Sequence, residues 1–167
     1  IIKAIVKALE SHPYLNAVLD DEREEIILKK YYNIGIAVDT EQGLMVPVIK
    51  VAQHKSLDEI AADIVRLADG ARQRKLNAAE VRDSTFTITN VGSIGGMFAT
   101  PIINYPETAI LLLGRIMEKP IVRDDTIQIR KILPVSLTFD HRIIDGAEAA
   151  RFINDLKKIL EDPDLIT

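Results

Sequence analysis

The sequence predicts a two-layer α/β sandwich, in which a mixed β-sheet carries its helices on one side. Short apolar runs separated by turn residues indicate antiparallel hairpins, and three or four segments with helical periodicity are interspersed among them. A doubly wound sheet would instead require a regular alternation of strand and helix. At 167 residues, the chain has the size of one domain with a sizeable core.

An amphipathic helix is expected at residues 1–11. Its apolar residues have the i, i+3, i+4, i+7 spacing of one helix face, and Pro13 ends it. No capping residue or initiator Met precedes this pattern, and the charged segment of a signal peptide is missing. We therefore expect 1–167 to be a domain shortened at its N-terminus. Short strands should follow at 16–19 and 25–28.

A stronger hairpin comes next, with strands at 33–38 and 44–51 around a turn at 39–43. Pro47 indicates an edge position or a bulge, because proline cannot donate to a neighbouring strand. Ser56 and Glu59 form a capping box, so a helix should run from there to about residue 75. Its expected apolar face consists of Leu57, Ile60, Ala61, Ile64, Leu67, Ala68 and Ala71.

The second half of the chain continues the mixed pattern. Strands are expected at 85–91, 108–116, 120–122, 126–129 and 133–139, with a glycine-rich segment at 92–96. The strand at 133–139 alternates apolar and polar residues, which predicts one buried face. The last helix should span 146–161, with Ala149, Ile153, Leu156 and Leu160 on its inner face.

The composition argues against several classes of protein. A net charge of −4 disfavours a nucleic-acid binder, and no apolar run reaches the ~18–20 residues of a membrane span. The absence of cysteine excludes disulfides, thiolate nucleophiles and cysteine metal sites. Two of the three histidines, His12 and His54, are expected at the surface.

The third histidine, His141, lies between an expected strand and an expected helix. Residues 140–146 read Asp-His-Arg-Ile-Ile-Asp-Gly, and such a turn suits a general base held in a fixed orientation. Two other interpretations remain open. Asp145, with Glu148 three residues later, would cap the helix and leave His141 as a turn residue. His141 and Asp145 could also be metal ligands, but no third ligand is nearby, so we expect no metal.

Thr89 lies near the end of the expected strand at 85–91. A hydroxyl in this position, followed by a flexible loop, could donate a hydrogen bond to an oxyanion. The alternative is an ordinary strand end with glycines for tight turning. The segment at 92–96 is not a phosphate loop, because it lacks the Lys-Ser/Thr ending.

Together these segments resemble the catalytic domain of the dihydrolipoamide acyltransferases, the core subunits of 2-oxo acid dehydrogenase complexes. The family hallmark D-H-R-x-x-D-G is matched at every fixed position by residues 140–146. The hallmark F-T-I-S-N-x-G-x-x-G-G, followed by P-x-x-x-x-P-E, matches 86–107 with Thr89 in place of the usual serine. Two further motifs, N-I-G-I-A-V-D-T-x-x-G-L-x-V-P and H-P-x-L-N-A, correspond to residues 33–47 and 12–17.

The resemblance implies a chloramphenicol acetyltransferase-like fold and acyl transfer between dihydrolipoamide and coenzyme A. It makes His141 the general base and Thr89 the oxyanion donor, contributed by two neighbouring subunits of a trimer. Asp145 would hold His141 and its loop in place through an arginine, either Arg142 or one outside this chain. The implied coenzyme A contacts are Asp39, Thr89, Asn90, Ser93, Gly114 and Ile116.

The resemblance also implies partners and a compartment. The trimers would assemble into a cubic or dodecahedral cage, and lipoate would arrive on a lipoyl domain that, like the peripheral-subunit-binding domain, lies outside this chain. The other partners would be the decarboxylase and dihydrolipoamide dehydrogenase of a pyruvate or branched-chain complex. The prokaryotic cytoplasm is favoured over the mitochondrial matrix.

Two alternative functions stay open. One is a catalytically inactive core scaffold, although such relatives lose the motif histidine. The other is a free-standing coenzyme A-dependent acetyltransferase, whose motif favours a second histidine at the position of Asp140.

Overall fold

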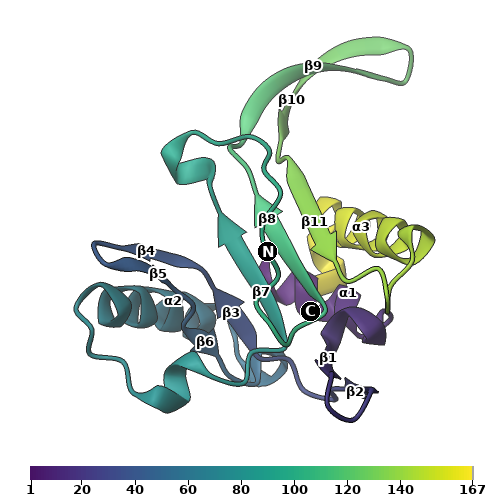
Figure 1. Cartoon of the computed structure of the whole chain (residues 1–167). Helices are drawn as coiled ribbons and strands as arrows, with labels where there is room; N and C mark the ends of the chain where they lie inside the picture. Colours follow the sequence, from purple (N-terminus) through teal and green to yellow (C-terminus); the bar gives the residue numbers. More distant parts are fainter. Residues whose placement is uncertain (167) are drawn as a thin grey trace.

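A mixed β-sheet forms the centre of the computed structural model, which describes residues 1–166 (Figure 1). In this part of the chain, the sheet has five strands. Their spatial order is β11 (Val135–Phe139), β8 (Ala109–Leu113), β7 (Phe86–Asn90), β3 (Ile34–Ile36) and β6 (Val48–Ile49). β7 runs parallel to both of its neighbours, whereas the two outer pairs are antiparallel. The predicted mixed sheet is therefore confirmed.

Within residues 1–166, three α-helices cover one face of this sheet: α1 (Ile2–Leu9), α2 (Leu57–Arg72) and α3 (Gly146–Glu161). Alternate side chains of a strand point to opposite faces, so Phe86 and Ile88 of β7 point toward the helices. They join a single buried cluster with residues of all three helices. The predicted two-layer arrangement, with helices on one side, is confirmed.

Helix α3 has the predicted bounds, but its inner face is turned relative to the prediction. The buried residues are Ala149, Phe152, Leu156 and Ile159. Ile153 and Leu160, which were expected inside, are only half-buried. Phe152 takes an inner position that the prediction did not give it, and its ring centre lies 5.9 Å from that of Phe86 on β7.

The predicted hairpin at 33–51 is divided into two pairs. β3 and β6 join the main sheet, while β4 (Val38–Thr40) and β5 (Gly43–Met45) form a separate ribbon. The division falls at Ala37, whose N–H donates to the Ile88 carbonyl of β7, and at Pro47, which has no N–H. β6 is the edge strand, so the edge position predicted from Pro47 is confirmed.

Helix α2 begins with the predicted capping box and ends at Arg72, three residues earlier than expected. Only Ile60, Leu67 and Ala71 of its predicted apolar face are buried, and Leu57 is 65% exposed. The helix packs against β4 and β6 at the margin of the sheet, so only a narrow stripe of its surface is covered.

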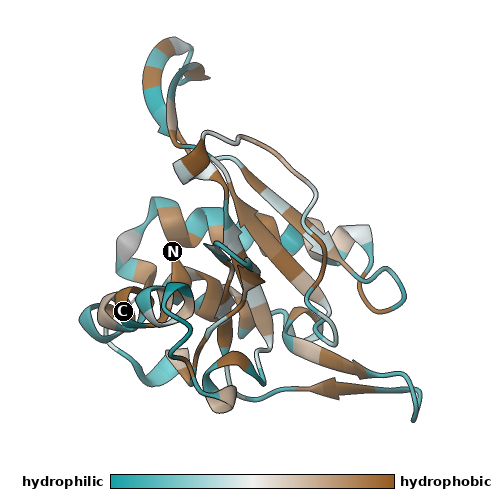
Figure 2. Ribbon diagram, turned by 60° about the vertical axis from the view of Figure 1, so that its left-hand side comes forward, coloured by the Kyte–Doolittle hydropathy of each residue, from teal (hydrophilic) through white to brown (hydrophobic). Residues whose placement is uncertain are grey.

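Two hairpins extend from the central sheet. β1 (Ala17–Asp20) pairs with β2 (Glu25–Leu28), and β9 (Met117–Arg123) pairs with β10 (Thr126–Ile132). The β9–β10 hairpin is longer than predicted and projects from the body as an arm, with Val122, Ile127 and Ile129 exposed (Figures 1 and 2). β11 shows no fully buried face, because it lies at the other edge of the sheet and all five of its residues are half-buried.

Short 3-10 helices connect several elements. They are Pro13–Asn16, Ala52–His54, Ala78–Val81, Gly92–Ile94 and Pro163–Ile166. Across residues 1–166, no helix combines the length and apolar character needed to cross a membrane.

Candidate active site

The turn that carries His141 is fixed by its backbone. The N–H of Asp140 donates to the Thr108 carbonyl at 2.9 Å, and the Asp140 carbonyl accepts from Ile143 and Ile144. Ile144 is 1% exposed, so it anchors the turn in the core. The His141 side chain itself is exposed, and its ring lies 5.6 Å from that of Phe139 at the end of β11. An imidazole in this position is open to a ligand or to another protein chain.

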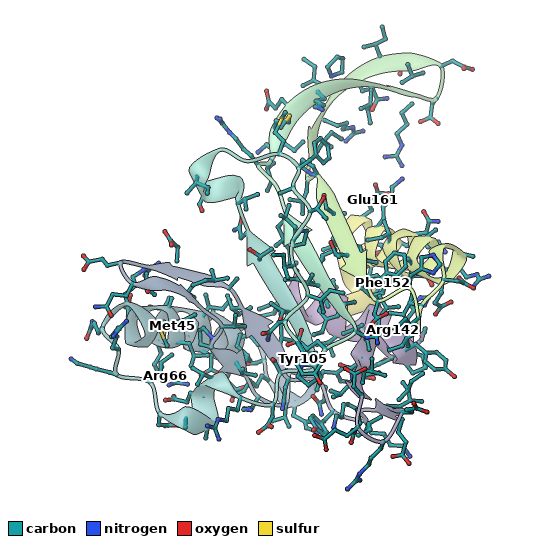
Figure 3. All side chains as sticks on the ribbon, in the orientation of Figure 1. Met45, Arg66, Tyr105, Arg142, Phe152 and Glu161 are labelled. Atoms are coloured by element: carbon teal, nitrogen blue, oxygen red, sulfur yellow. The ribbon has the colours of Figure 1, made fainter. Side chains whose placement is uncertain are left out.

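Arg142 joins this turn to the β1–β2 hairpin. Its guanidinium donates to both oxygens of Asp140, the shortest contact being 2.6 Å, and to Asp21 at 3.2 Å. These hydrogen bonds hold the pKa of Asp140 below its usual value. Figure 3 shows Arg142 at the lower end of the sheet, below α3. Its carboxylate partners are thus Asp140 and Asp21, and not Asp145.

Asp145 caps helix α3, as one of the two interpretations of its spacing predicted. Its Oδ1 accepts from the N–H of Glu148 at 2.7 Å. This contact satisfies a backbone donor of the first turn and fixes where the helix begins, four residues after His141.

Thr89 lies at the opposite end of the sheet, near the C-terminus of β7. It is half-buried and is registered with Leu112 of β8, which in turn pairs with Ser136 of β11. β11 ends at Phe139, three residues or roughly 10 Å beyond Ser136 at ~3.3 Å per residue, and His141 follows in the turn after the strand. One chain therefore does not bring Thr89 and His141 to a common substrate.

The predicted coenzyme A contacts gather at the Thr89 end. Asn90 and Ser93 follow β7, Gly114 and Ile116 follow β8, and Asp39 comes shortly after the parallel strand β3. The Asn90 side chain accepts from the Gly92 N–H at 2.9 Å and tightens the loop. An open hollow of about 500 Å³ lies beside these loops, lined in part by Ile116 and Arg115.

Glycine is required where two of these loops touch. A Cβ on Gly114 would lie 2.1 Å from the Met97 carbonyl oxygen, and one on Gly92 would lie 2.6 Å from the Gly114 carbonyl oxygen. Both contacts are with backbone, which cannot turn aside as a side chain can. The loops after β7 and β8 are thus locked together beside Thr89.

His12 is buried, so its predicted surface position is wrong. It is 4% exposed, with Nδ1 2.8 Å from Glu148 and Nε2 3.1 Å from Asp155, and its ring packs edge-on against Phe152. The turn after α1 carries it onto α3, a contact between segments far apart in sequence. The hydrogen bond from His12 is the main reason that the pKa of Glu148 is lowered. His54 is exposed, as predicted.

Sequence reasoning missed the buried carboxyl group of Glu107. It is 4% exposed, and one of its oxygens, Oε1, accepts from Ser84, Thr87 and Asn104. Burial raises the pKa of Glu107, although the three hydrogen bonds oppose that shift. The only signal in the sequence is a glutamate directly before a buried strand.

No group of three or more His, Cys, Asp or Glu side chains within residues 1–166 could hold a metal ion.

Comparisons with known proteins identify the family of this chain. The family model for the 2-oxoacid dehydrogenases acyltransferase (catalytic domain) matches residues 1–167. The dihydrolipoyllysine-residue acetyltransferase component of the Bacillus subtilis pyruvate dehydrogenase complex is 52% identical over 166 residues, which cover 99% of this chain and 38% of that protein. The chain thus spans less than half the length of this curated relative.

Solved structures show the same fold. Azotobacter vinelandii dihydrolipoamide acetyltransferase is 44% identical, with a TM-score of 0.95 over 99% of this chain and 68% of that one. The cubic core of a pyruvate dehydrogenase complex is 43% identical, with the same TM-score and coverage. A chloramphenicol acetyltransferase, 16% identical with a TM-score of 0.59 over 95% of this chain and 75% of that one, shares the fold.

Proposed function

The chain belongs to the 2-oxoacid dehydrogenase acyltransferase (catalytic domain) family, and we propose that it transfers an acyl group between dihydrolipoamide and coenzyme A at a site shared by two subunits. The observation that carries this proposal is the placement of Thr89 and His141 at opposite ends of one sheet. A neighbouring copy can bring its own His141 to Thr89, whereas a single chain cannot.

The sequence spacing of the site residues supports their roles. A serine, a histidine and an asparagine were studied in the catalytic mechanism of the Azotobacter vinelandii enzyme. They follow one another at the same spacing as Thr89, His141 and Asp145. Threonine retains the hydroxyl of serine but is stiffer about χ1. Aspartate and asparagine are both good caps for a helix start.

In the proposed reaction, His141 of the partner subunit removes the proton from a thiol of dihydrolipoamide or coenzyme A. Imidazole suits this step because it is available as a neutral base near neutral pH. The thiolate attacks the thioester carbonyl carbon, and the carbonyl oxygen becomes an oxyanion that accepts a hydrogen bond from Thr89. When the tetrahedral intermediate collapses, the other thiolate leaves and recovers the proton from the imidazolium. No covalent enzyme intermediate is needed, which agrees with a chain without cysteine.

We assign coenzyme A to the loops at the Thr89 end. Asp39, Asn90, Ser93, Gly114 and Ile116 lie on neighbouring strands or loops there, so together they can hold one extended ligand. The lipoyl group would come from a lipoyl domain and reach the same carbonyl from the side of His141. The acyl group would be acetyl, because the curated relatives are acetyltransferase components of pyruvate dehydrogenase complexes.

The proposal extends to assembly and context. Trimers would provide the shared site and would build a cage, because a solved core with 43% identity is cubic. The decarboxylase and dihydrolipoamide dehydrogenase components would be partners in that complex. Residues 1–167 would act as a catalytic domain in the bacterial cytoplasm, since the curated relatives come from Bacillus and Staphylococcus.

A transfer assay tests this function directly. The protein is mixed with dihydrolipoamide and acetyl-, isobutyryl- or succinyl-coenzyme A, and thioester formation is followed. We expect transfer that is fastest with acetyl. An assembled protein that transfers none of the three would favour the inactive scaffold, and faster transfer to other acceptors would favour a free-standing acetyltransferase.

A further inference from the structure

Glu107 connects three segments of the chain through one carboxylate oxygen. Ser84 precedes β7, Thr87 lies within β7, and Asn104 belongs to residues 97–106, which we call the strap. The distances to Oε1 are 2.8 Å from the Thr87 hydroxyl and 2.9 Å from the Asn104 amide, and the Ser84 hydroxyl also donates. The mechanism described above makes no use of this group.

The strap crosses the face of the sheet that the helices leave open. At its first end, the N–H of Arg115 donates to the Gly96 carbonyl at 2.8 Å, and Gly114 packs against Met97. At its second end, Asn104 reaches Glu107 and Thr87. Figure 1 shows this segment running along the sheet from the upper end of β8 to the start of β8. The strap is thus fastened at both ends of the sheet.

Thr89 points to that same face. Thr87 and Thr89 are two residues apart on β7, so their side chains share a side, and their register partners on β8 are Ile110 and Leu112. Ile110 and Leu112 are only 5% and 1% exposed, although they lie outside the buried cluster that the three helices share with the sheet. The strap therefore covers the surface from which Thr89 presents its hydroxyl.

The absence of a side chain at Gly35 leaves room for the hydrogen bonds around Glu107. Gly35 on β3 is registered with Thr87, and a Cβ there would lie 2.7 Å from the Thr87 hydroxyl oxygen. The second carboxylate oxygen of Glu107 is buried and accepts no hydrogen bond from residues 1–166. The three donors all meet at Oε1, so this atom is the acceptor that joins β7 to the strap.

We propose that Glu107 is a positioning residue for Thr89: by joining β7 to the strap, it fixes the strand face from which Thr89 donates to the oxyanion. This inference rests on the proposed function. Glu107 contacts Thr87, which lies two residues before Thr89 on β7, so its effect on the reaction would be exerted through Thr89.

The inference is tested with a double-mutant cycle on the full chain, using acetyl-coenzyme A and dihydrolipoamide as substrates. We expect Glu107→Ala to lower kcat at least about 10-fold with little change in KM, because misplacing a reacting group is costly. In a Thr89→Ala background, the same substitution should lower kcat by less than about 2-fold, because the positioned hydroxyl is already gone. An equal loss in both backgrounds, or no loss in either, would overturn the inference.

Two milder variants keep the test valid if Glu107→Ala does not fold. Glu107→Gln retains an acceptor oxygen and should keep kcat within about 3-fold. Thr87→Val removes one hydrogen-bond donor while nearly keeping the shape of the side chain. It should lower kcat when Thr89 is present but not in the Thr89→Ala background. Glu161→Gln, on the exposed end of α3, is the matched control. Absence of transfer in the unmodified protein would refute the proposed function. If the unmodified protein is active and Glu107→Ala lowers kcat by the same factor with and without Thr89→Ala, only the role of Glu107 would be refuted.

Discussion

His141 is the side chain on which the proposed chemistry depends most directly. We expect His141→Ala to lower kcat by roughly 10²–10⁴, because general-base catalysis contributes about that much. The side chain is exposed, so the variant should unfold at the same temperature as the unmodified protein. The exposed His54 provides a control, and His54→Ala should leave kcat unchanged. Near-normal turnover in His141→Ala would refute its role as the base.

Glu107 should make stability depend on pH. Folding raises its pKa above the ordinary value of 4.5, mainly through burial. Its contribution to stability is therefore full below about pH 4.5 and is lost as the pH rises through the raised value. Glu107→Gln cannot ionise, so relative to the unmodified protein it should gain thermal stability between pH 4 and pH 8. Calorimetry at both pH values measures the Tm of Glu107→Gln relative to the unmodified protein, with Glu161→Gln as the control. The same Tm difference at pH 4 and at pH 8 would contradict the prediction.

Among single residues, the sequence identified those with local signals and missed those defined by distant contacts. Asp145 was predictable as a cap because its partner, Glu148, is three residues away. His12 was not, because its partners Glu148 and Asp155 lie on a helix more than 130 residues later. Glu107 was missed because its burial depends on a strap that crosses the sheet.

Helices were predicted more accurately than paired strands. The bounds of α3 follow from a cap and a periodic pattern, which are both local. The hairpin at 33–51 was predicted as one unit but forms two pairs, since Ala37 donates to β7, a strand about 50 residues later. Its pairing thus depends on the completed sheet. The apolar side of α2 was overpredicted for the same reason, because the sheet ends beneath it.

The start of α3 offers a test of how a cap supports the catalytic turn. Asp145→Ala should cost about 1 kcal/mol of stability, or about 2–4 °C in Tm, because the Glu148 N–H loses its acceptor. Asp145→Asn should cost much less, because asparagine caps equally well. Thermal melts of both variants measure the difference. Equal losses would show that the charge of Asp145, and not its capping oxygen, is what stabilises the turn.

The complete site could not be predicted from one chain by physical reasoning alone. Residue patterns identified Thr89 and His141 as candidates, and the family resemblance implied that they meet across subunits. The fold supports that arrangement because the strand order separates them within a chain. The exposed apolar side chains of the β9–β10 arm, among them Val122 and Ile127, also leave a surface that association would bury.

Association should therefore be a condition for activity. We expect sedimentation to show trimers or larger cages, and transfer activity to appear only in those fractions. An active monomer, stable over the concentrations of the assay, would contradict the shared site.

The separation of Thr89 from His141 also has a genetic meaning. An allele that encodes Thr89→Ala and another that encodes His141→Ala should each be defective alone, yet the two should complement each other in one cell. In randomly mixed trimers, about one site in four would draw its histidine and its hydroxyl from intact copies. Two recessive lesions in the same gene would then restore growth together, whereas two lesions at the same end of the sheet would not.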